Sequence, residues 1–239
     1  MRITPLLLLC LIVNTVGPHD GLSQTLRRLK SNTTNPLRAL IFSDTSNGRA
    51  FGDGCTEDVT NDGGKTWDAS PMDPIFVSNL RCATLTDGYH YCVAGDAGHV
   101  YTFAHGTSLT RVPLPESKSV YGMTFATADT GVIVGAGGLI YKTNDSGITW
   151  HKLKLPPQLS NHDFYGVDYW DDSTYWVVGA AGIALYTEDA GTTWQRIAVG
   201  TNKDLYSINF PDASSNGWIV GDQTLLYTTD DGTTWTSVP

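Results

Sequence analysis

The chain has 239 residues, of which 41% are hydrophobic and only 16% are charged, with 25 glycines and a formal net charge of −9. Few charges, many glycines and 10% aromatic residues favour short strands joined by tight turns. The acidic balance argues against a nucleic-acid partner, because phosphate binding needs concentrated Lys and Arg. After the N-terminus no apolar run is long enough for membrane insertion.

Residues 1–23 have the pattern of a secretory signal peptide. One basic residue, Arg2, precedes the apolar residues 6–13, and the small residues Gly17, Gly21 and Ser23 follow. We expect cleavage after Gly17 or after Ser23, and a secreted protein without membrane insertion once the signal is removed. An uncleaved anchor is the alternative, but the apolar run is shorter than the ~20 residues that a spanning helix needs.

One phrase, Thr-x-Asp-x-Gly-x-Thr-Trp, occurs four times, at residues 60–67, 143–150, 187–194 and 228–235. Its tryptophans are 83, 44 and 41 residues apart, so the first gap holds two periods. A worn copy lies at residues 102–109, with Ala in place of Asp and Leu in place of Trp, and a weaker echo lies at residues 25–29. An unbroken period of 41–44 residues predicts one closed array of repeated units.

Each unit carries four strand signals, which the last unit shows best at residues 205–210, 217–220, 225–229 and 235–238. Four strands in a ~40-residue period are typical of a propeller blade. Helical solenoids share this period, but alternating Thr, Val, Tyr and Trp with frequent Gly oppose helix formation. Small residues such as Gly122 and Gly166 in the first strand indicate crowding near a central axis.

The sequence therefore predicts an all-β, five-bladed propeller of four-stranded antiparallel blades over residues 37–239. Complete units begin near Leu37, Asn79, Val120, Phe164 and Leu205. Residues 24–36 form a linker or an extra outer strand, which either extends the edge of the last blade, displaces its outermost strand or stays unstructured. The first of these would cover an exposed strand edge.

Three cysteines remain after signal removal, namely Cys55, Cys82 and Cys92. A three-residue turn at residues 86–88 would set Cys82 opposite Cys92, and this predicts a cross-strand disulfide with Cys55 as a buried thiol. A bond from Cys55 to Cys82 across neighbouring blades is the alternative. Asn32, in the sequence Asn-Thr-Thr, is a glycosylation acceptor if the host secretes through an endoplasmic reticulum.

The repeated phrase resembles the Asp-box, or BNR repeat, of sialidases, sortilin-type receptors and photosystem II assembly factors. This resemblance implies that each box forms the turn between the third and fourth strands of a blade. An Asp can accept hydrogen bonds from its own turn, Gly permits the backbone angles, and Trp covers the hairpin. We assign this structural role to Asp62, Trp67, Asp145, Trp150, Asp189, Trp194, Asp230 and Trp235.

A row of carboxylates also invites a calcium site or acid–base catalysis. The four box aspartates, however, belong to different blades, whereas calcium needs six to eight converging oxygens and glycosidase carboxylates face each other within ~10 Å. We predict no metal, no cofactor and no catalytic residue. Asp168 and Glu116 are the carboxylates to consider if the chain is nevertheless a glycosidase.

In antiparallel blades the boxes share one face with the turns between the first and second strands. The links between blades and the turns between the second and third strands share the other face, where the innermost strands begin. Candidate binding residues at this channel mouth are Arg38, Arg81, Tyr121, Tyr165 and Tyr206, with Asp53, Asp96 and Asp222 beside them. Arginine, phenol and carboxylate groups around a funnel can hold a peptide carboxylate or a sugar.

A purely structural role is the alternative for these residues. Tyr121, Tyr165 and Tyr206 are in register with core positions, so they can pack between blades. Arg38 and Arg81 can form structural ion pairs with Asp53 and Asp96.

We expect a non-catalytic binding or assembly module that recognises a protein or peptide partner through the channel mouth. Residues 176–179 and 185–187, which run into a box, resemble the photosystem II assembly factor branch, and the resemblance covers residues 37–239. It implies a chaperone for newly made reaction-centre protein, although that branch has seven blades. A secreted lectin or glycosidase with a glycan ligand is the other alternative.

Overall fold

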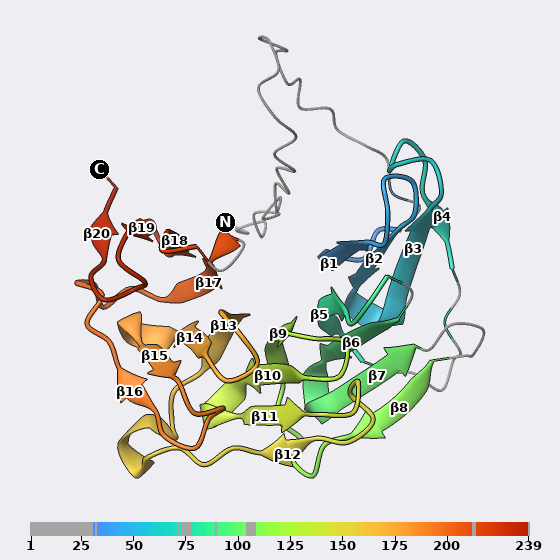
Figure 1. Cartoon of the computed structure of the whole chain (residues 1–239). Helices are drawn as coiled ribbons and strands as arrows, with labels where there is room; N and C mark the ends of the chain where they lie inside the picture. The colour runs from blue at the N-terminus through green and yellow to red at the C-terminus, as the bar shows by residue number, and fades with distance from the viewer. Residues whose placement is uncertain are drawn as a thin grey trace, which may run out of the picture.

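The structure, a computed structural model, describes residues 31, 33–70, 72, 78–88, 90–103, 109–211 and 214–238. Five four-stranded antiparallel sheets follow one another along the chain, and in each the strands pair in sequence order. The predicted five blades of an all-β propeller are confirmed (Figure 1). The signal peptide, the echo at residues 25–29 and Asn32 lie outside the described residues.

The strands are as follows. Blade 1 has β1 (Leu37–Phe42), β2 (Gly48–Gly52), β3 (Thr56–Thr60) and β4 (Asp68–Ala69); blade 2 has β5 (Leu80–Leu85), β6 (Tyr91–Gly95), β7 (His99–Phe103) and β8 (Thr110–Pro113). Blade 3 has β9 (Val120–Phe125), β10 (Gly131–Gly135), β11 (Ile140–Thr143) and β12 (His151–Lys152). Blade 4 has β13 (Phe164–Tyr169), β14 (Tyr175–Gly179), β15 (Ala184–Thr187) and β16 (Gln195–Arg196); blade 5 has β17 (Leu205–Asn209), β18 (Gly217–Gly221), β19 (Thr224–Thr228) and β20 (Thr236–Ser237).

The helical elements among the described residues are single 3₁₀ turns, at Asp53–Cys55, Asp96–Gly98, Ala136–Gly138, Pro157–Leu159 and Ala180–Gly182. Four of them join the second strand of a blade to the third, and Pro157–Leu159 lies in the link between blades 3 and 4. Within the described part of the chain no helix is both long and apolar enough to cross a bilayer.

The innermost strands pack directly on one another around the axis, in the order β1, β5, β9, β13 and β17. A Cβ added at Gly122 would lie 2.8 Å from the carbonyl oxygen of Tyr165, and one at Gly166 would lie 2.9 Å from Cα of Ser207. The predicted small residues of the first strand therefore let neighbouring backbones approach closely.

The hydrophobic core is divided among the blade junctions. In the described residues there are four apolar clusters, one each between blades 1 and 2, 2 and 3, 3 and 4, and 4 and 5. For example, Val134 and Ile140 of blade 3 pack with Phe164, Val177 and Leu185 of blade 4. Blades 2, 3 and 4 therefore bury apolar residues on both faces, because each of them packs on a blade on either side.

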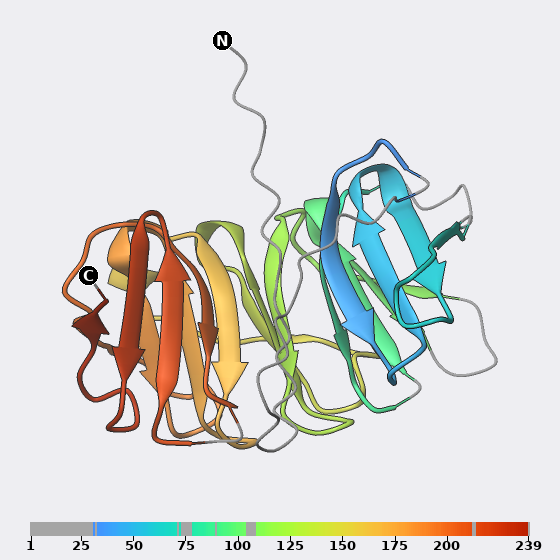
Figure 2. The ribbon, with the colours of Figure 1, turned by 90° about the horizontal axis from the view of Figure 1, so that it is seen from above.

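The array is an open arc, which corrects the prediction of a closed one. β17 and β1 stand at its two ends in Figure 1, and Figure 2 shows blades 5 and 1 apart when the arc is viewed from above. No apolar cluster of described residues joins blade 5 to blade 1. A repeat period fixes the unit, but closure also depends on the angle between units, which the period does not contain.

Each complete Asp box forms the turn between the third and fourth strands of its blade. In blade 3, Asp145 accepts hydrogen bonds from the Thr149 N–H (2.8 Å) and hydroxyl (2.6 Å), and the Thr143 hydroxyl accepts the Gly147 N–H (3.0 Å). The same bonds recur in blades 1, 4 and 5. Gly147 has a φ of 82°, a left-handed conformation that glycine adopts without steric cost.

The worn copy in blade 2 is displaced by one residue. The register pairs Phe103 with Tyr91, as the box residue Thr143 pairs with Gly131, so Phe103 and not Thr102 occupies the place of the box threonine. The connection from this position to the outer strand at Thr110 is one residue shorter than in the other blades. Placing the imperfect copy at residues 102–109 therefore assigned the box threonine position to Thr102, one residue before Phe103, which occupies it in the structure.

The predicted disulfide is not formed. Cys82 pairs with Ala94 and Cys92 with Thr84, so the two cysteines are diagonal neighbours, and Cys55, Cys82 and Cys92 are all free thiols. Diagonal positions in an antiparallel pair are roughly 7–8 Å apart, beyond the usual Cα separation of a disulfide. The hairpin turn is longer than the predicted three residues, because β5 ends at Leu85 and β6 begins at Tyr91.

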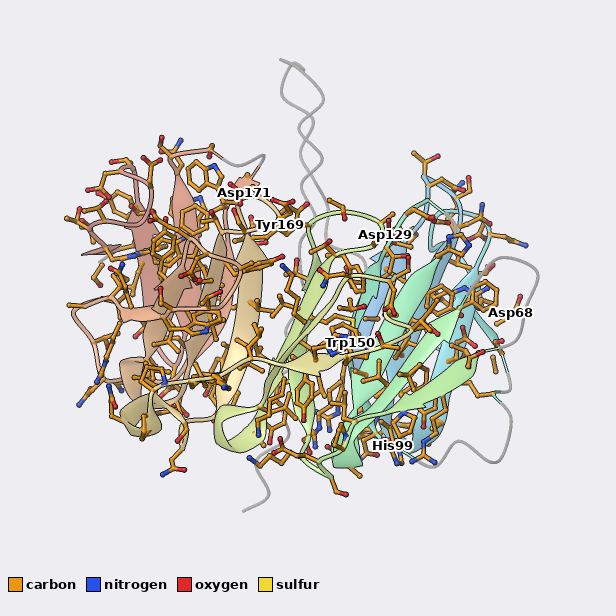
Figure 3. The ribbon with its side chains drawn as sticks, turned by 60° about the horizontal axis from the view of Figure 1, so that its bottom comes forward. Asp68, His99, Asp129, Trp150, Tyr169 and Asp171 are labelled. Carbon is orange, nitrogen blue, oxygen red and sulfur yellow. The ribbon has the colours of Figure 1, made fainter. Side chains whose placement is uncertain are left out.

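The two faces of the arc are distinct in Figure 3. Asp129 and Asp171 lie in turns between first and second strands and are at the top, whereas His99, which follows a turn between second and third strands, is at the bottom. The Ser146 hydroxyl in the box of blade 3 donates to Asp129 at 2.7 Å, so the boxes share the upper face. We call this the box face, and the opposite one the mouth face.

Candidate functional site

Five β-bulges mark the mouth face, one at the start of each innermost strand. In blade 1, Leu37 pairs with Gly52 and Ala39 with Phe51, which leaves Arg38 as the extra residue. The same shift leaves Arg81, Tyr121, Tyr165 and Tyr206 as the extra residues of the other four blades. These are the five mouth residues that the sequence singled out, which we call the mouth ring.

The bulges explain why these side chains leave the core. The preceding residue is buried in blades 2–5, with 0% exposure of Leu80, Val120, Phe164 and Leu205. Because the extra residue is outside the ladder, its side chain no longer follows the alternation of the strand, and a bulge re-aims it. The tyrosines therefore do not continue the core positions, and Tyr206 is 46% exposed.

A glycine opposite each bulge makes room for the link. The glycine pairs with the first residue of the innermost strand, and a Cβ on it would lie 1.9–2.2 Å from the carbonyl oxygen of the preceding link residue. The five are Gly52, Gly95, Gly135, Gly179 and Gly221. No larger residue fits there without moving the link.

The two arginines are held by carboxylates of their own blades. Arg38 forms a two-point ion pair with Asp53, with Nε to Oδ1 at 2.5 Å and Nη2 to Oδ2 at 2.7 Å. Arg81 pairs in the same way with Asp96, through Nε and, at 3.1 Å, through Nη2. Both arginine side chains remain about one-third exposed, at 36% and 30%.

These contacts keep both carboxylates ionised. The hydrogen bond from Arg38 lowers the pKa of Asp53. Burial raises the pKa of Asp96, but hydrogen bonds from Arg81, Ser119 and Asn79 outweigh it and bring that pKa to about 2. The pairs fix the direction of both arginines, and each guanidinium keeps N–H donors that the aspartate does not use.

The aromatic side of the mouth ring is continuous. The Arg81 guanidinium carbon lies 5.5 Å from the centre of the Tyr121 ring. The Tyr121 and Tyr165 rings are 5.6 Å apart and tilted by 46°, and Tyr165 and Tyr206 are 5.7 Å apart and tilted by 49°. The mouth therefore presents a curved strip of three phenol rings that ends on a guanidinium.

Further carboxylates on this face clasp neighbouring blades. Asp163, in the link before blade 4, accepts the Gly137 N–H of blade 3 at 2.7 Å, and Asp204, before blade 5, accepts the Ala181 N–H of blade 4 at 2.9 Å. Asn79 binds the Gly54 N–H of blade 1 in the same way at 3.0 Å. The sequence reasoning missed these contacts, and their signal is a polar residue, Asn79, Asp163 or Asp204, directly before the innermost strands of blades 2, 4 and 5.

Asp222 differs from the other two carboxylates predicted beside the mouth ring. It has no arginine partner among the described residues, and its Oδ2 lies 3.8 Å from Nζ of Lys203. Its side chain is half exposed.

The two carboxylates considered for a glycosidase do not form a facing pair. Asp168, on the innermost β13, accepts the Phe210 N–H of blade 5 at 2.6 Å, and burial raises its pKa to about 6. Glu116 lies beside outer strands of blade 3, where it pairs with Lys152 and accepts the Tyr141 hydroxyl at 3.0 Å; the Lys152 bond lowers its pKa to about 2. Within the described residues no cluster of three potential metal ligands occurs.

Box turns, bulged strand entrances and radial sheets together define an Asp-box β-propeller. The chain resembles the photosystem II assembly factor branch of these propellers. A family model described as photosynthesis system II assembly factor YCF48 matches residues 103–203, which span blades 3 and 4 and the end of blade 2. A search of curated protein sequences found no match.

Solved structures agree on the fold. YCF48 from Cyanidioschyzon merolae has a TM-score of 0.62 at 18% identity, with 76% of this chain and 63% of that chain covered, so this chain spans less than two thirds of it. An ancestral GH74 enzyme has a TM-score of 0.70 at 16% identity, covering 91% and 33%. YCF48 bound to D1 peptide has a TM-score of 0.49 at 18% identity, covering 84% and 95%. At these identities the likeness to the first two structures establishes the propeller fold alone.

Proposed function

We propose that this chain is a non-catalytic assembly factor that binds a segment of a partner protein across the mouth ring. The match of residues 103–203 to a photosynthesis system II assembly factor model supports an assembly role. The observation that carries the proposal is the set of five bulges, which present two arginines and three tyrosines on one face.

The chemistry of the ring suits a peptide. Contiguous tyrosine rings offer apolar faces with hydroxyl groups at their tips, a combination that is enriched at protein interfaces. The unused N–H donors of Arg38 and Arg81 suit backbone carbonyls or a carboxylate, although a carboxylate has to compete with Asp53 and Asp96. We therefore expect a ligand that lays apolar or aromatic side chains on the tyrosines and places an acceptor beside Arg81.

The predicted leader adds a location to this proposal. We propose that residues 1–23 direct the chain out of the cytoplasm and are then removed, so that the chain binds its partner outside the cytoplasm. N-terminal sequencing of the mature protein tests this, because it should begin at residue 18 or residue 24. A mature chain that begins at Met1 or Arg2 contradicts it.

Peptide binding at the ring is tested with a fluorescent D1 peptide of photosystem II and, in a second arm, with peptides selected from a random library against the wild-type chain. Fluorescence anisotropy compares wild type with Tyr165→Ala, with Ile148→Ala as the control. Ile148 is 63% exposed and lies in a box turn of the opposite face. A tyrosine anchor typically contributes enough that its loss weakens binding about tenfold or more, whereas Ile148→Ala should bind as wild type.

The thermal unfolding midpoint of each variant checks that the blades remain folded. The proposal fails if neither the D1 peptide nor any selected peptide distinguishes folded Tyr165→Ala from wild type. Binding of the same variants to a glycan array tests the lectin alternative. If wild type binds no peptide but binds a sugar that Tyr165→Ala no longer binds, the chain is a lectin.

A further inference from the structure

At every junction between two consecutive blades, apolar residues from one face of the first blade pack on apolar residues from the opposite face of the next blade. Each blade therefore has two faces. The forward face packs on the next blade in the chain, and the backward face packs on the preceding one. In blade 4 the forward face comprises Trp176, Val178, Ala184 and Tyr186, which pack on blade 5 in one apolar cluster. Trp176 is 2% exposed, and Val178 and Ala184 are 0% exposed.

Blade 5 repeats this face but leaves it uncovered. By register, Trp218, Val220, Leu225 and Tyr227 occupy the places of the four blade 4 residues. Trp176 and Tyr186 form an aromatic pair with centres 4.4 Å apart, and Trp218 and Tyr227 form the same pair at 5.8 Å. Yet Trp218 is 44% exposed and Leu225 is 37% exposed. A face with the composition of a blade junction is thus open to solvent at the end of the arc.

Blade 1 is not built to cover it. On its backward face Asp58 stands where the other blades have Tyr101, Tyr141, Leu185 and Leu226. Asp58 is 1% exposed, and neither carboxylate oxygen has a hydrogen-bond partner among the described residues. Pro36 also precedes β1 at the position where Asp204 forms the clasp before blade 5. Packing Trp218 and Leu225 over a carboxylate is unfavourable.

The composition of the exposed face favours pairing with itself. Its side chains carry no formal charge, although the whole chain has a net charge of −9, so two copies can approach here without direct repulsion between like charges. Aromatic and aliphatic residues at the centre are typical of interface cores. Two such sheets can stack face to face, as in a β-sandwich, and a two-fold axis makes the contact self-complementary and closed.

We propose that the forward face of blade 5 is a homodimer interface, in which Trp218 and Leu225 of one copy pack on the same residues of a second copy around a two-fold axis. This inference is independent of the mouth ring. The dimer has the two arcs joined at their C-terminal blades, and it leaves both mouths free.

Analytical ultracentrifugation of the full chain over a range of ~1–100 μM tests the interface. Wild type should sediment as a dimer at high concentration, and Trp218→Lys/Leu225→Lys should remain monomeric throughout, since two buried charges oppose each other across the axis. Ile148→Lys adds one lysine at a 63% exposed apolar residue outside this face, so it is the matched control for Leu225→Lys, and it should dimerise as wild type. Leu225→Lys alone is the second variant if the double variant unfolds.

A wild-type chain that is monomeric over the whole range overturns the proposal. So does dimerisation that survives in a folded Trp218→Lys/Leu225→Lys variant. Open-ended growth with concentration that Leu40→Lys abolishes would show head-to-tail packing on blade 1, where Leu40 is 41% exposed, and would also overturn it.

Discussion

Replacing Asp168 by Asn should stabilise the propeller at neutral pH and remove part of its pH dependence. Asp168 is held at the junction of blades 4 and 5 by the Phe210 N–H, and burial raises its pKa to about 6. An acid whose pKa is higher in the folded state than in the unfolded state destabilises the fold once it ionises. Its unfavourable contribution is absent below pH ~4, grows as the pH rises to about 6, and is constant above.

The magnitude follows from the shift. Between the usual value of 3.8 and about 6 the pKa changes by about two units, which corresponds to roughly 3 kcal/mol at about 1.4 kcal/mol per unit. The asparagine amide oxygen can still accept the Phe210 N–H, so the variant keeps the bond without the buried charge. For a chain of this size a gain of 3 kcal/mol raises the unfolding midpoint by roughly 6–12 °C, and partial relaxation around Asn makes this an upper bound.

Thermal and urea unfolding of both proteins between pH 4 and pH 8 measure the effect. The variant should gain on wild type as the pH rises from 4 to 6.5, and the difference should then level off. Asp171→Asn is the control of opposite sign, because hydrogen bonds from residues 173 and 174 outweigh burial and lower the pKa of Asp171. Removing that carboxylate should cost stability at neutral pH. The reasoning is refuted if Asp168→Asn is no more stable than wild type at pH 7.5, or if its advantage is the same at pH 4.

Three further predictions concern the scaffold. Gly95→Ala should destabilise the fold by several kcal/mol, since its Cβ would lie 1.9 Å from a link carbonyl oxygen, whereas Gly88→Ala, with nothing within 4 Å, should be near neutral in urea unfolding. Asp145→Ala removes three hydrogen bonds of the blade 3 box and should cost about 1–3 kcal/mol; an unchanged urea midpoint would contradict its structural role. Burial raises the pKa of both Cys82 and Cys92 to about 12, so a thiol reagent at pH 8 should modify them only after unfolding. If Cys55, Cys82 and Cys92 do not all react with the reagent after unfolding, a disulfide is present and the prediction is wrong.

Much of the fold could be predicted because the residues that repeat in the sequence are the ones that form the recurring turn of each blade. Each box needs Asp as an acceptor and Gly at positive φ, so its position in the sequence marks the turn between strands three and four. That anchor was enough to place every strand of blade 5 to within about two residues. It failed in blade 2, where Phe103 replaces the box threonine and the turn is one residue shorter.

The mouth residues were found, but the reason for their exposure was not. Position alone made Tyr165 equivalent to a core residue, since alternation along an unbroken strand would direct it between the blades. A bulge adds one residue to one strand of a pair, and this depends on the partner strand rather than on local composition. The recurrent glycine opposite it, such as Gly179, is the signal that sequence reasoning could have used.

The sequence could not predict whether the array of blades closes or whether the cysteines form a disulfide, and the two reasons are related. Both depend on distances between elements, and a repeat sequence gives the same local pattern whether the array is an arc or a ring. Asp58 is a buried polar residue on a face that is apolar in the other blades, and this difference between blade 1 and the other blades was not used in the sequence analysis. Cys82 and Cys92 required the register of one hairpin to within a single residue pair.

The five bulges place the mouth ring outside the strand pairing that holds the fold. Each ring residue stands outside the ladder of hydrogen bonds that holds its sheet, while the neighbouring core residue and the opposite glycine maintain the blade. Exchanging Tyr121 for Arg, or Arg38 for Tyr, changes what the mouth presents without altering a strand pair. If the mouth ring binds the partner as we propose, natural variation or protein engineering at these five positions can alter the preferred partner while the strand pairing of the scaffold remains the same.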